Sequence, residues 1–172
     1  GNKEVDKTNR RYLETVIRHH VSGRFKVAPE HCSPTVLGLM RKPAFGLFQQ
    51  LKSIFDEINR KHRLNEQIIP YFISSHPGCR PEDMAETLDF KLEQVQDFTP
   101  TPMTVATTIY YSGYHPYSLQ KIDTAKSEKE KKQQNMFFFW YKREFREQIM
   151  TLLRRIHRAD LIPKLYGKER EK

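Results

Sequence analysis

Residues 68–78 read IIPYFISSHPG, a nearly continuous apolar run that ends in a polar tip marked by proline and glycine. Two other stretches have the same form, FKVAPEHC at residues 25–32 and VQDFTPTPMT at residues 95–104. A helical pattern precedes or follows each stretch, and this order is typical of a parallel α/β sheet or barrel. Because parallel strands end at the same edge of a sheet, we expect the three polar tips to gather at the carboxyl edge, where such folds bind ligands.

The helices are predicted from apolar residues at spacings of three and four and from their start and stop signals. Residues 110–120 (YYSGYHPYSLQ) are expected to form an irregular aromatic loop, and residues 121–134 a charged linker or helix. Pro70 is the main objection to the second strand, since proline cannot donate a ladder hydrogen bond, but it is tolerable near a strand start. The expected helices cover residues 8–20, 33–40, 43–60, 81–88 and 145–156, with a final short turn at 161–165.

The composition is that of a folded domain. The 172 residues suffice for one hydrophobic core, and no window approaches the roughly 18 uncharged apolar residues of a membrane span. The two cysteines, far apart and without motif spacing, argue against a disulfide scaffold and favour a cytoplasmic protein.

The net charge of +9 is unevenly placed. Residues 1–120 hold 15 Lys/Arg and 13 Asp/Glu, whereas residues 121–172 hold 15 and 8. This basic tail fits contact with RNA or acidic protein, or simply a solvated helix. The aromatic run at 137–141 could stack nucleobases or, as such runs more often do, form core or a docking face.

The first two tips carry groups that could bind a ligand. Glu30 and His31 together suit ribose hydroxyls or an ammonium group, or they are loop residues satisfied by backbone amides. The residues around His76 in SSHPG, namely Ser74, Ser75 and Gly78, allow a close backbone approach to phosphate or adenosine, although Pro-Gly is also a plain turn signal.

Other chemistry is weakly indicated. A zinc site from His31, Cys32, His76 and Cys79 is conceivable, but adjacent residues rarely chelate one ion, so we expect no metal site. No catalytic triad, phosphate loop or GxGxxG is present, and Asp97 has no obvious acid/base partner in the sequence.

Three segments carry a resemblance to a known family. APEHCSPTVLGLMRKP (28–43), IIPYFISSHPG (68–78) and EQVQDFTPTPMTVATTIYYSG (93–113) resemble the carboxyl-terminal half of the YgiQ family of radical S-adenosylmethionine proteins. They are more distantly similar to the methylthiotransferases. The match covers about residues 8–120, and residues 136–167 resemble the family's carboxyl-terminal extension.

The resemblance implies a partial barrel of the triosephosphate-isomerase type, here a half-barrel over residues 1–120 with a basic helical extension over 121–172. It implies an enzyme whose [4Fe-4S] cluster, held by a C-x3-C-x2-C loop, reduces S-adenosylmethionine to give a 5′-deoxyadenosyl radical. By position, the resemblance places Glu30 and His31 near the ribose and amino-acid part of the cofactor. It places near the adenosine Ser74, Ser75, His76 and Gly78, and on the adenine or substrate side Phe98, Thr99 and Thr101.

Two departures from the family pattern matter. The sequence has no C-x3-C-x2-C, so we expect the cluster loop upstream of Gly1, in a missing amino-terminal half, and no cluster or activity in this fragment alone. The segment EDMAETLDFKLEQ (82–94) is short for a parallel crossover, which leaves open whether residues are missing near Glu86.

The sequence therefore predicts the carboxyl-terminal piece of a radical S-adenosylmethionine enzyme of unknown substrate, with Glu30, Ser75 and Thr99 on one rim. The expected partners are the missing half and, through the exposed sheet edge, a second copy. The alternative is an RNA- or protein-binding module that uses the basic aromatic tail.

Overall fold

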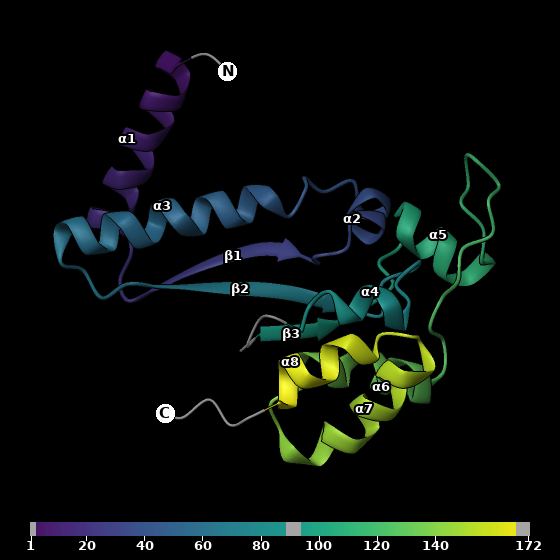
Figure 1. Ribbon diagram of the computed structural model, residues 1–172. Helices are drawn as coiled ribbons and strands as arrows, with labels where there is room; N and C mark the ends of the chain where they lie inside the picture. The colour runs from purple at the N-terminus through teal and green to yellow at the C-terminus, as the bar shows by residue number, and fades with distance from the viewer. Residues whose placement is uncertain (1–2, 89–93, 168–172) are drawn as a thin grey trace.

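The computed structural model of the chain describes residues 3–88 and 94–167, and Figure 1 shows their arrangement. Within these ranges no helix is long and apolar enough to cross a membrane. The helices and strands are α1 (Lys3–His20), β1 (Arg24–Glu30), α2 (Pro34–Met40), α3 (Gly46–His62), β2 (Gln67–Ser74), α4 (Pro81–Ala85), β3 (Gln94–Asp97), α5 (Val105–Ser112), α6 (Glu128–Phe138), α7 (Arg146–Arg155) and α8 (Ile162–Tyr166), with short 3-10 turns at Arg143–Phe145 and Ala159–Leu161.

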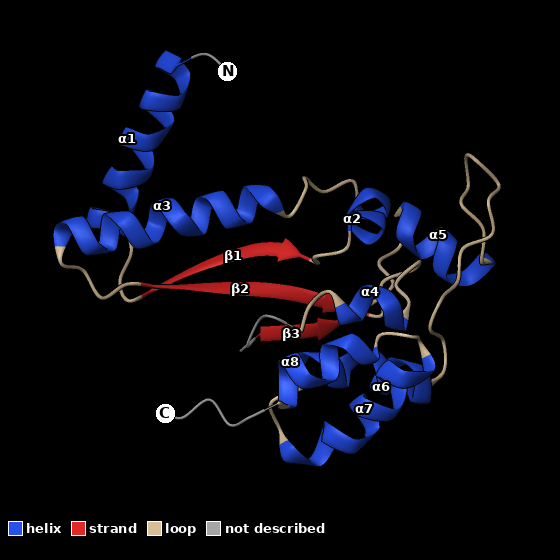
Figure 2. Cartoon of the chain, in the orientation of Figure 1, coloured by secondary structure: helices blue, strands red, loops and turns tan. Residues whose placement is uncertain are grey.

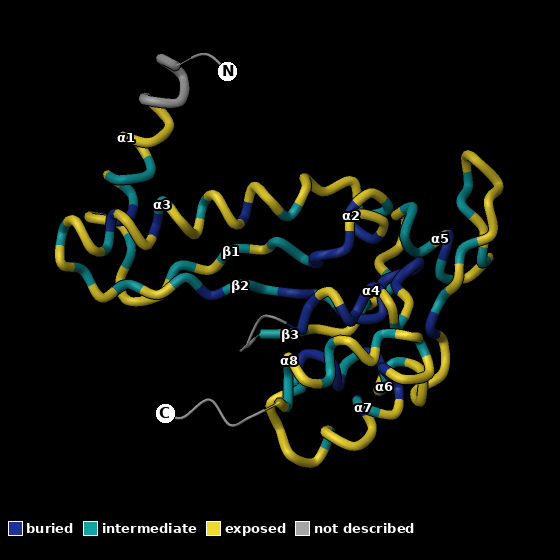
Figure 3. The backbone as a smooth tube through the Cα atoms, viewed as in Figure 1, coloured by how far each residue is buried: buried dark blue, intermediate teal, exposed yellow. Residues whose placement is uncertain are grey.

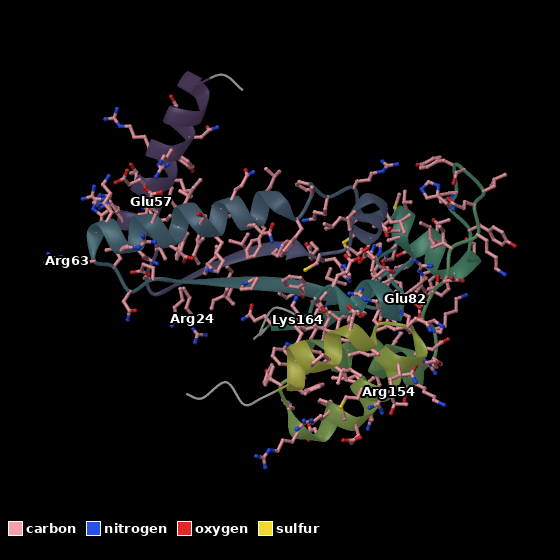
Figure 4. The ribbon with its side chains drawn as sticks, viewed as in Figure 1. Arg24, Glu57, Arg63, Glu82, Arg154 and Lys164 are labelled. Atoms are coloured by element: carbon pink, nitrogen blue, oxygen red, sulfur yellow. The ribbon has the colours of Figure 1, made fainter. Side chains whose placement is uncertain are left out.

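The three strands form one parallel sheet in the order β1-β2-β3, which confirms the predicted strand direction and the α/β class (Figure 2). The polar tips consequently lie at one end of the sheet. Figure 4 places Glu82 near this carboxyl end, while Arg24 and Arg63 mark the opposite end. The sheet is open, because neither β1 nor β3 has a second neighbour among the described strands.

The helices pack mainly on one face of the sheet. Phe25 and Ile68 contribute to one core beneath α1 and α3, and Phe72 contributes to a larger core with α2, α4, α6 and α7. Ile68 and Phe72 are four residues apart on β2 and therefore share a face. On the other face Ile69 is buried, but Lys26 and Gln96 are exposed. An α/β protein normally covers both faces, whereas the described residues leave part of this second face exposed.

Several helix boundaries differ from the predictions. The first helix begins at Lys3 rather than at Thr8, and α3 begins at Gly46, three residues after Pro43. Ser33 sits at the N-cap of α2, but its side chain makes no capping hydrogen bond and instead donates to Asp83 Oδ1 at 2.7 Å. The Ser33 hydroxyl thus bonds to the buried Asp83 carboxylate instead of capping α2.

Helix α5 was not predicted, and it takes in the first residues of the expected aromatic loop. Its N-cap is Thr104, whose hydroxyl accepts from the Thr107 amide at 3.2 Å. The charged segment after Lys121 is extended at first and becomes helical at Glu128. Helix α6 then continues into the aromatic run and ends at Phe138.

The segment that connects β2 to β3 is short, and the two strands are nevertheless parallel. It contains α4, whose first turn carries Pro81, Glu82 and Asp83, as expected. Part of the expected third strand, residues 92–93, lies outside the described residues. The parallel pairing of Tyr71 with Gln94 shows that the chain returns to the same end of the sheet with the residues it has.

Candidate functional site

A cavity of about 460 Å³ opens at the carboxyl end of the sheet, between the tips of β1 and β3 and the ends of α2 and α5. Its volume falls in the usual range of small-molecule pockets, about 300–1,000 Å³. The sequence-predicted residues that line it are Glu30, His76, Phe98, Thr99 and Thr101.

Glu30 is the least satisfied polar group of this cavity. Its side chain is 13% exposed, and one carboxylate oxygen lies 3.1 Å from Lys42 Nζ. The other oxygen, Oε2, is buried and has no hydrogen-bond partner. The backbone at Glu30 has φ 68°, a left-handed conformation that is rare for a residue with a side chain. A buried carboxylate oxygen without a partner is costly, and a bound cation or hydroxyl would satisfy it.

Two basic residues that the sequence analysis missed line the same cavity. Arg41 and Lys42 follow directly after α2, where Arg41 adopts the left-handed helix-ending conformation with φ 54°. The Lys42 amide donates to the Leu37 carbonyl at 2.9 Å and fixes the turn. No local motif indicated this, because a helix that follows a parallel strand normally ends away from the carboxyl edge, whereas α2 has only seven residues.

An aromatic wall closes another side. The His76 ring meets Phe98 edge-on, with ring centroids 5.1 Å apart, and Phe98 lies 5.7 Å from Tyr110. His76 Nδ1 donates to the Pro77 carbonyl at 2.9 Å. Burial lowers the pKa of His76, so the ring is neutral at pH 7 and Nε2 remains a hydrogen-bond acceptor.

The loop after β3 supplies hydroxyl groups. Thr99 and Thr101 are exposed and line the cavity, as their flanking prolines predicted. Behind them the Thr104 and Thr107 hydroxyls both donate to the Thr101 carbonyl, at 2.9 and 2.7 Å. These bonds tie the loop to α5 and hold its outer hydroxyls at the cavity.

His31, Ser74, Ser75 and Gly78 are buried and do not line the cavity. Figure 3 shows that much of the backbone between the end of β2 and α4 is buried. Glu30 and Thr99 therefore share the predicted rim, and Ser75 does not. Ser75 has φ 58°, which turns the chain inward after β2, and its buried hydroxyl has no hydrogen-bond partner. The neighbouring Ser74 hydroxyl donates to Asp97 Oδ1, which joins β2 to β3.

His31 lies in the interior. Its Nδ1 accepts from the Ser33 amide at 2.9 Å, so the proton of the neutral ring is on Nε2, 3.5 Å from Cys79 Sγ. Desolvation lowers the pKa of His31 to about 4 despite the nearby Asp83 carboxylate. Burial raises the pKa of the Cys79 thiol, which therefore stays protonated. The pair is suited to packing rather than to nucleophilic chemistry.

The carboxyl-terminal helices hold the tip of β2. Gln134 of α6 accepts from the Ser75 amide at 3.1 Å and donates to the Cys79 carbonyl at 2.7 Å. The Gly78 amide donates to the Asp123 carbonyl at 2.7 Å. The SSHPG turn thus owes its shape to residues far along the chain, which no local motif indicated.

Within residues 3–88 and 94–167, no group of three His, Cys, Asp or Glu side chains is placed to hold a metal ion. Of the four residues of the conceived zinc site, His31 and Cys79 are in contact, with Nε2 and Sγ 3.5 Å apart. The chain has two cysteines, Cys32 and Cys79, and both are buried. A [4Fe-4S] cluster held through three cysteine thiolates therefore does not fit the residues of this chain.

The aromatic run of the tail is core. Phe137 and Phe138 are fully buried, and Phe138 packs edge-on against Phe72 with centroids 5.9 Å apart. Their rings are not available to stack on nucleobases, whereas Tyr141 at the end of the run is 42% exposed. The physical reason for the burial is that α6 is amphipathic at this end and lays the Phe137 and Phe138 rings on the sheet.

Fold and pocket together define an open-sheet α/β protein with a small-molecule cavity at its carboxyl edge. Residues 93–169 match a family described as "Domain of unknown function (DUF3362)". Similar curated proteins carry the name "UPF0313 protein", and the chain belongs to this UPF0313 family. The chain is 59% identical to one from Bacteroides thetaiotaomicron over 95% of its length, 58% to one from Porphyromonas gingivalis over 96%, and 38% to one from Methanosarcina acetivorans over 88%. It spans 27%, 27% and 21% of these relatives, about a quarter of their length.

Proposed function

We propose that the cavity binds S-adenosylmethionine and that the longer protein is a radical S-adenosylmethionine enzyme, of which this chain forms one wall of the cofactor site. The proposal extends the resemblance to the YgiQ family. The observation that carries it is the Glu30 carboxylate, a group that lines a cavity of suitable size and has one oxygen without a hydrogen-bond partner.

The cavity supplies complementary groups for each part of this cofactor. Glu30 suits the ammonium of the methionine moiety, and Lys42 suits its carboxylate. Phe98 offers an aromatic edge or face for the adenine. Thr99 and Thr101 offer hydroxyls for the ribose. When bound, the cofactor supplies the radical chemistry, while the groups of this chain bind and orient it.

The cluster ligands of such an enzyme have to come from another part of the longer protein, because this chain does not fit the cluster. The relatives are about four times as long, which provides room for such a part. The open sheet is consistent with a half-barrel whose free strand edges pair with further strands, either from that part or from a second copy. We derive no step through the cluster.

The test is a titration of the ¹⁵N-labelled chain with S-adenosylmethionine, followed by amide chemical shifts. One wall of a site binds weakly, so we expect a dissociation constant in the millimolar range, with shifts at Glu30 and along residues 98–104. Glu30→Gln removes the charge at almost constant shape and should weaken binding about tenfold.

Glu57→Gln is the matched control, since Glu57 lies on α3 at the opposite end of the sheet (Figure 4). It should leave the affinity unchanged. Shifts spread evenly over the surface, or equal affinities of wild type and Glu30→Gln, would refute the proposal.

A further inference from the structure

A second surface at the carboxyl end is rich in exposed aromatic side chains. Residues 98–122 contain no Asp or Glu, and half of the chain's eight tyrosines fall within residues 110–117. Tyr111 is 69% exposed, Tyr114 49% and Tyr117 72%. Exposed aromatic groups gathered in one place usually mark a binding surface.

The backbone presents Tyr114 and Tyr117 on a small projecting loop, and Tyr111 lies in the last turn of α5 just before it. After α5, the amides of His115 and Ile122 donate to the carbonyls of Gln120 and Gly113, and Tyr114 pairs with Lys121 in an antiparallel bridge. Figure 1 shows this loop extending from α5 away from the sheet. The rings are therefore held on an ordered support, which lowers the entropy cost of binding through them.

Cations lie beside the rings. The Arg41 guanidinium is 5.8 Å from the Tyr117 ring centre, and Lys131 Nζ is 5.4 Å from the Tyr110 ring centre. Lys126 Nζ donates to the Tyr111 carbonyl at 3.1 Å. Three nearby carboxylates are engaged within the protein, while Asp123, between Lys121 and Lys126, is exposed. Glu30 pairs with Lys42, Asp97 accepts from Asn135 at 3.0 Å, and Glu130 accepts at the α6 cap.

We propose that this tyrosine surface, formed by Tyr111, Tyr114 and Tyr117 with Arg41, Lys121 and Lys126, binds single-stranded nucleic acid. Bases stack on the exposed rings, and the cations pair with phosphates, which is the chemistry of sequence-tolerant single-strand binding. An acidic polypeptide would use the cations but would gain little from three exposed rings. The proposal does not rest on cofactor binding in the cavity.

Fluorescence anisotropy with a labelled oligouridylate and a labelled oligothymidylate measures the interaction. Tyr111→Ala and Tyr117→Ala should each weaken binding about tenfold, and Tyr117→Phe should restore it because the ring face remains. With three phosphate contacts, raising the salt from about 50 to about 200 mM should weaken binding about 20-fold.

Tyr12→Ala is the matched control, because Tyr12 on α1 is also 72% exposed but lies at the other end of the protein. It should bind like wild type. These substitutions are at exposed sites, and circular dichroism confirms that each variant is folded.

The absence of binding at low salt would overturn the proposal. Binding that the alanine variants do not weaken would overturn it as well, as would competition by polyglutamate equal to that of unlabelled oligonucleotide.

Discussion

Replacing Gly78 by alanine separates two reasons why a buried turn can require glycine, namely its backbone angle and its lack of a side chain. Gly78 has φ 84°, and a Cβ built there would lie 2.2 Å from Leu39 Cδ1. The left-handed conformation costs an alanine about 1–2 kcal/mol, and moving the end of the half-buried Leu39 side chain costs about 1 kcal/mol more. We therefore expect Gly78→Ala to lower the free energy of unfolding by about 2–3 kcal/mol.

Gly23 supplies a control with the same backbone angle. Its φ is also 84°, but a Cβ there would meet nothing within 4 Å. Gly23→Ala should therefore cost only the backbone term of about 1–2 kcal/mol. Urea denaturation of both variants measures the difference, since the slope should stay constant while the midpoint moves.

The double variant Gly78→Ala/Leu39→Ala tests the cause. If the Leu39 contact accounts for the excess, adding Gly78→Ala to Leu39→Ala should cost about the same as Gly23→Ala, a coupling that a double-mutant cycle detects. Equal costs for the Gly23 and Gly78 single variants would refute the reasoning. That result would mean that Gly78 is needed for its backbone angle alone.

The remaining predictions concern the buried side chains. Below pH 6.5 the unfolded chain binds a proton at His31, whereas the folded protein keeps that ring neutral down to about pH 4. Between pH 7 and pH 4 the free energy of unfolding should therefore fall by about 2–3 kcal/mol more in the wild type than in His31→Asn. Urea denaturation at each pH measures this free energy. Parallel curves of unfolding free energy against pH for the two proteins would contradict the prediction. Phe138→Ala should lower the free energy of unfolding by about 3–5 kcal/mol, because Phe138 is fully buried. Tyr141 is partly exposed, and Tyr141→Ala should change the free energy of unfolding by no more than about 0.5 kcal/mol. Similar shifts of the melting temperature in the two variants would show that Phe138 does not belong to the core.

The strands were predictable because their signal is local. Three apolar runs that each end in a polar tip gave the parallel sheet, and even the doubtful Pro70 proved compatible with it. Pro70 pairs with Val27 of β1, and the described pairing of β2 with β3 starts at Tyr71.

The rim of the site was only partly predictable. Along a strand, alternation predicts on which face of the sheet each side chain lies. A residue in the left-handed conformation after the strand end changes the direction in which the following side chains point. The sequence does not reveal which non-glycine residues adopt this conformation. Glu30 and Ser75 both do so. Ser75 and its neighbours consequently turn into the interior, and Arg41 and Lys42 reach the cavity from the end of α2.

Helix α5 was missed for a different reason. Its sequence VATTIYYS is rich in β-branched and aromatic residues, which have low helix propensity. The Thr104 cap and the hydroxyl bonds to the Thr101 carbonyl support the helix, and threonine at an N-cap is a usable signal. Local propensity alone pointed to a loop.

The division of the chain at residue 120 follows a change in charge, yet the packing crosses it. Gln134 and Asp123 hydrogen-bond the tip of β2, and Phe138 packs on Phe72 in the middle of the sheet. Removing residues 121–172 would therefore disrupt the core and the turn beside the cavity together with the basic tail. Loss of nucleic-acid binding in such a truncation would say nothing about where the nucleic acid binds, which is why the point substitutions at Tyr111 and Tyr117 are the decisive experiment.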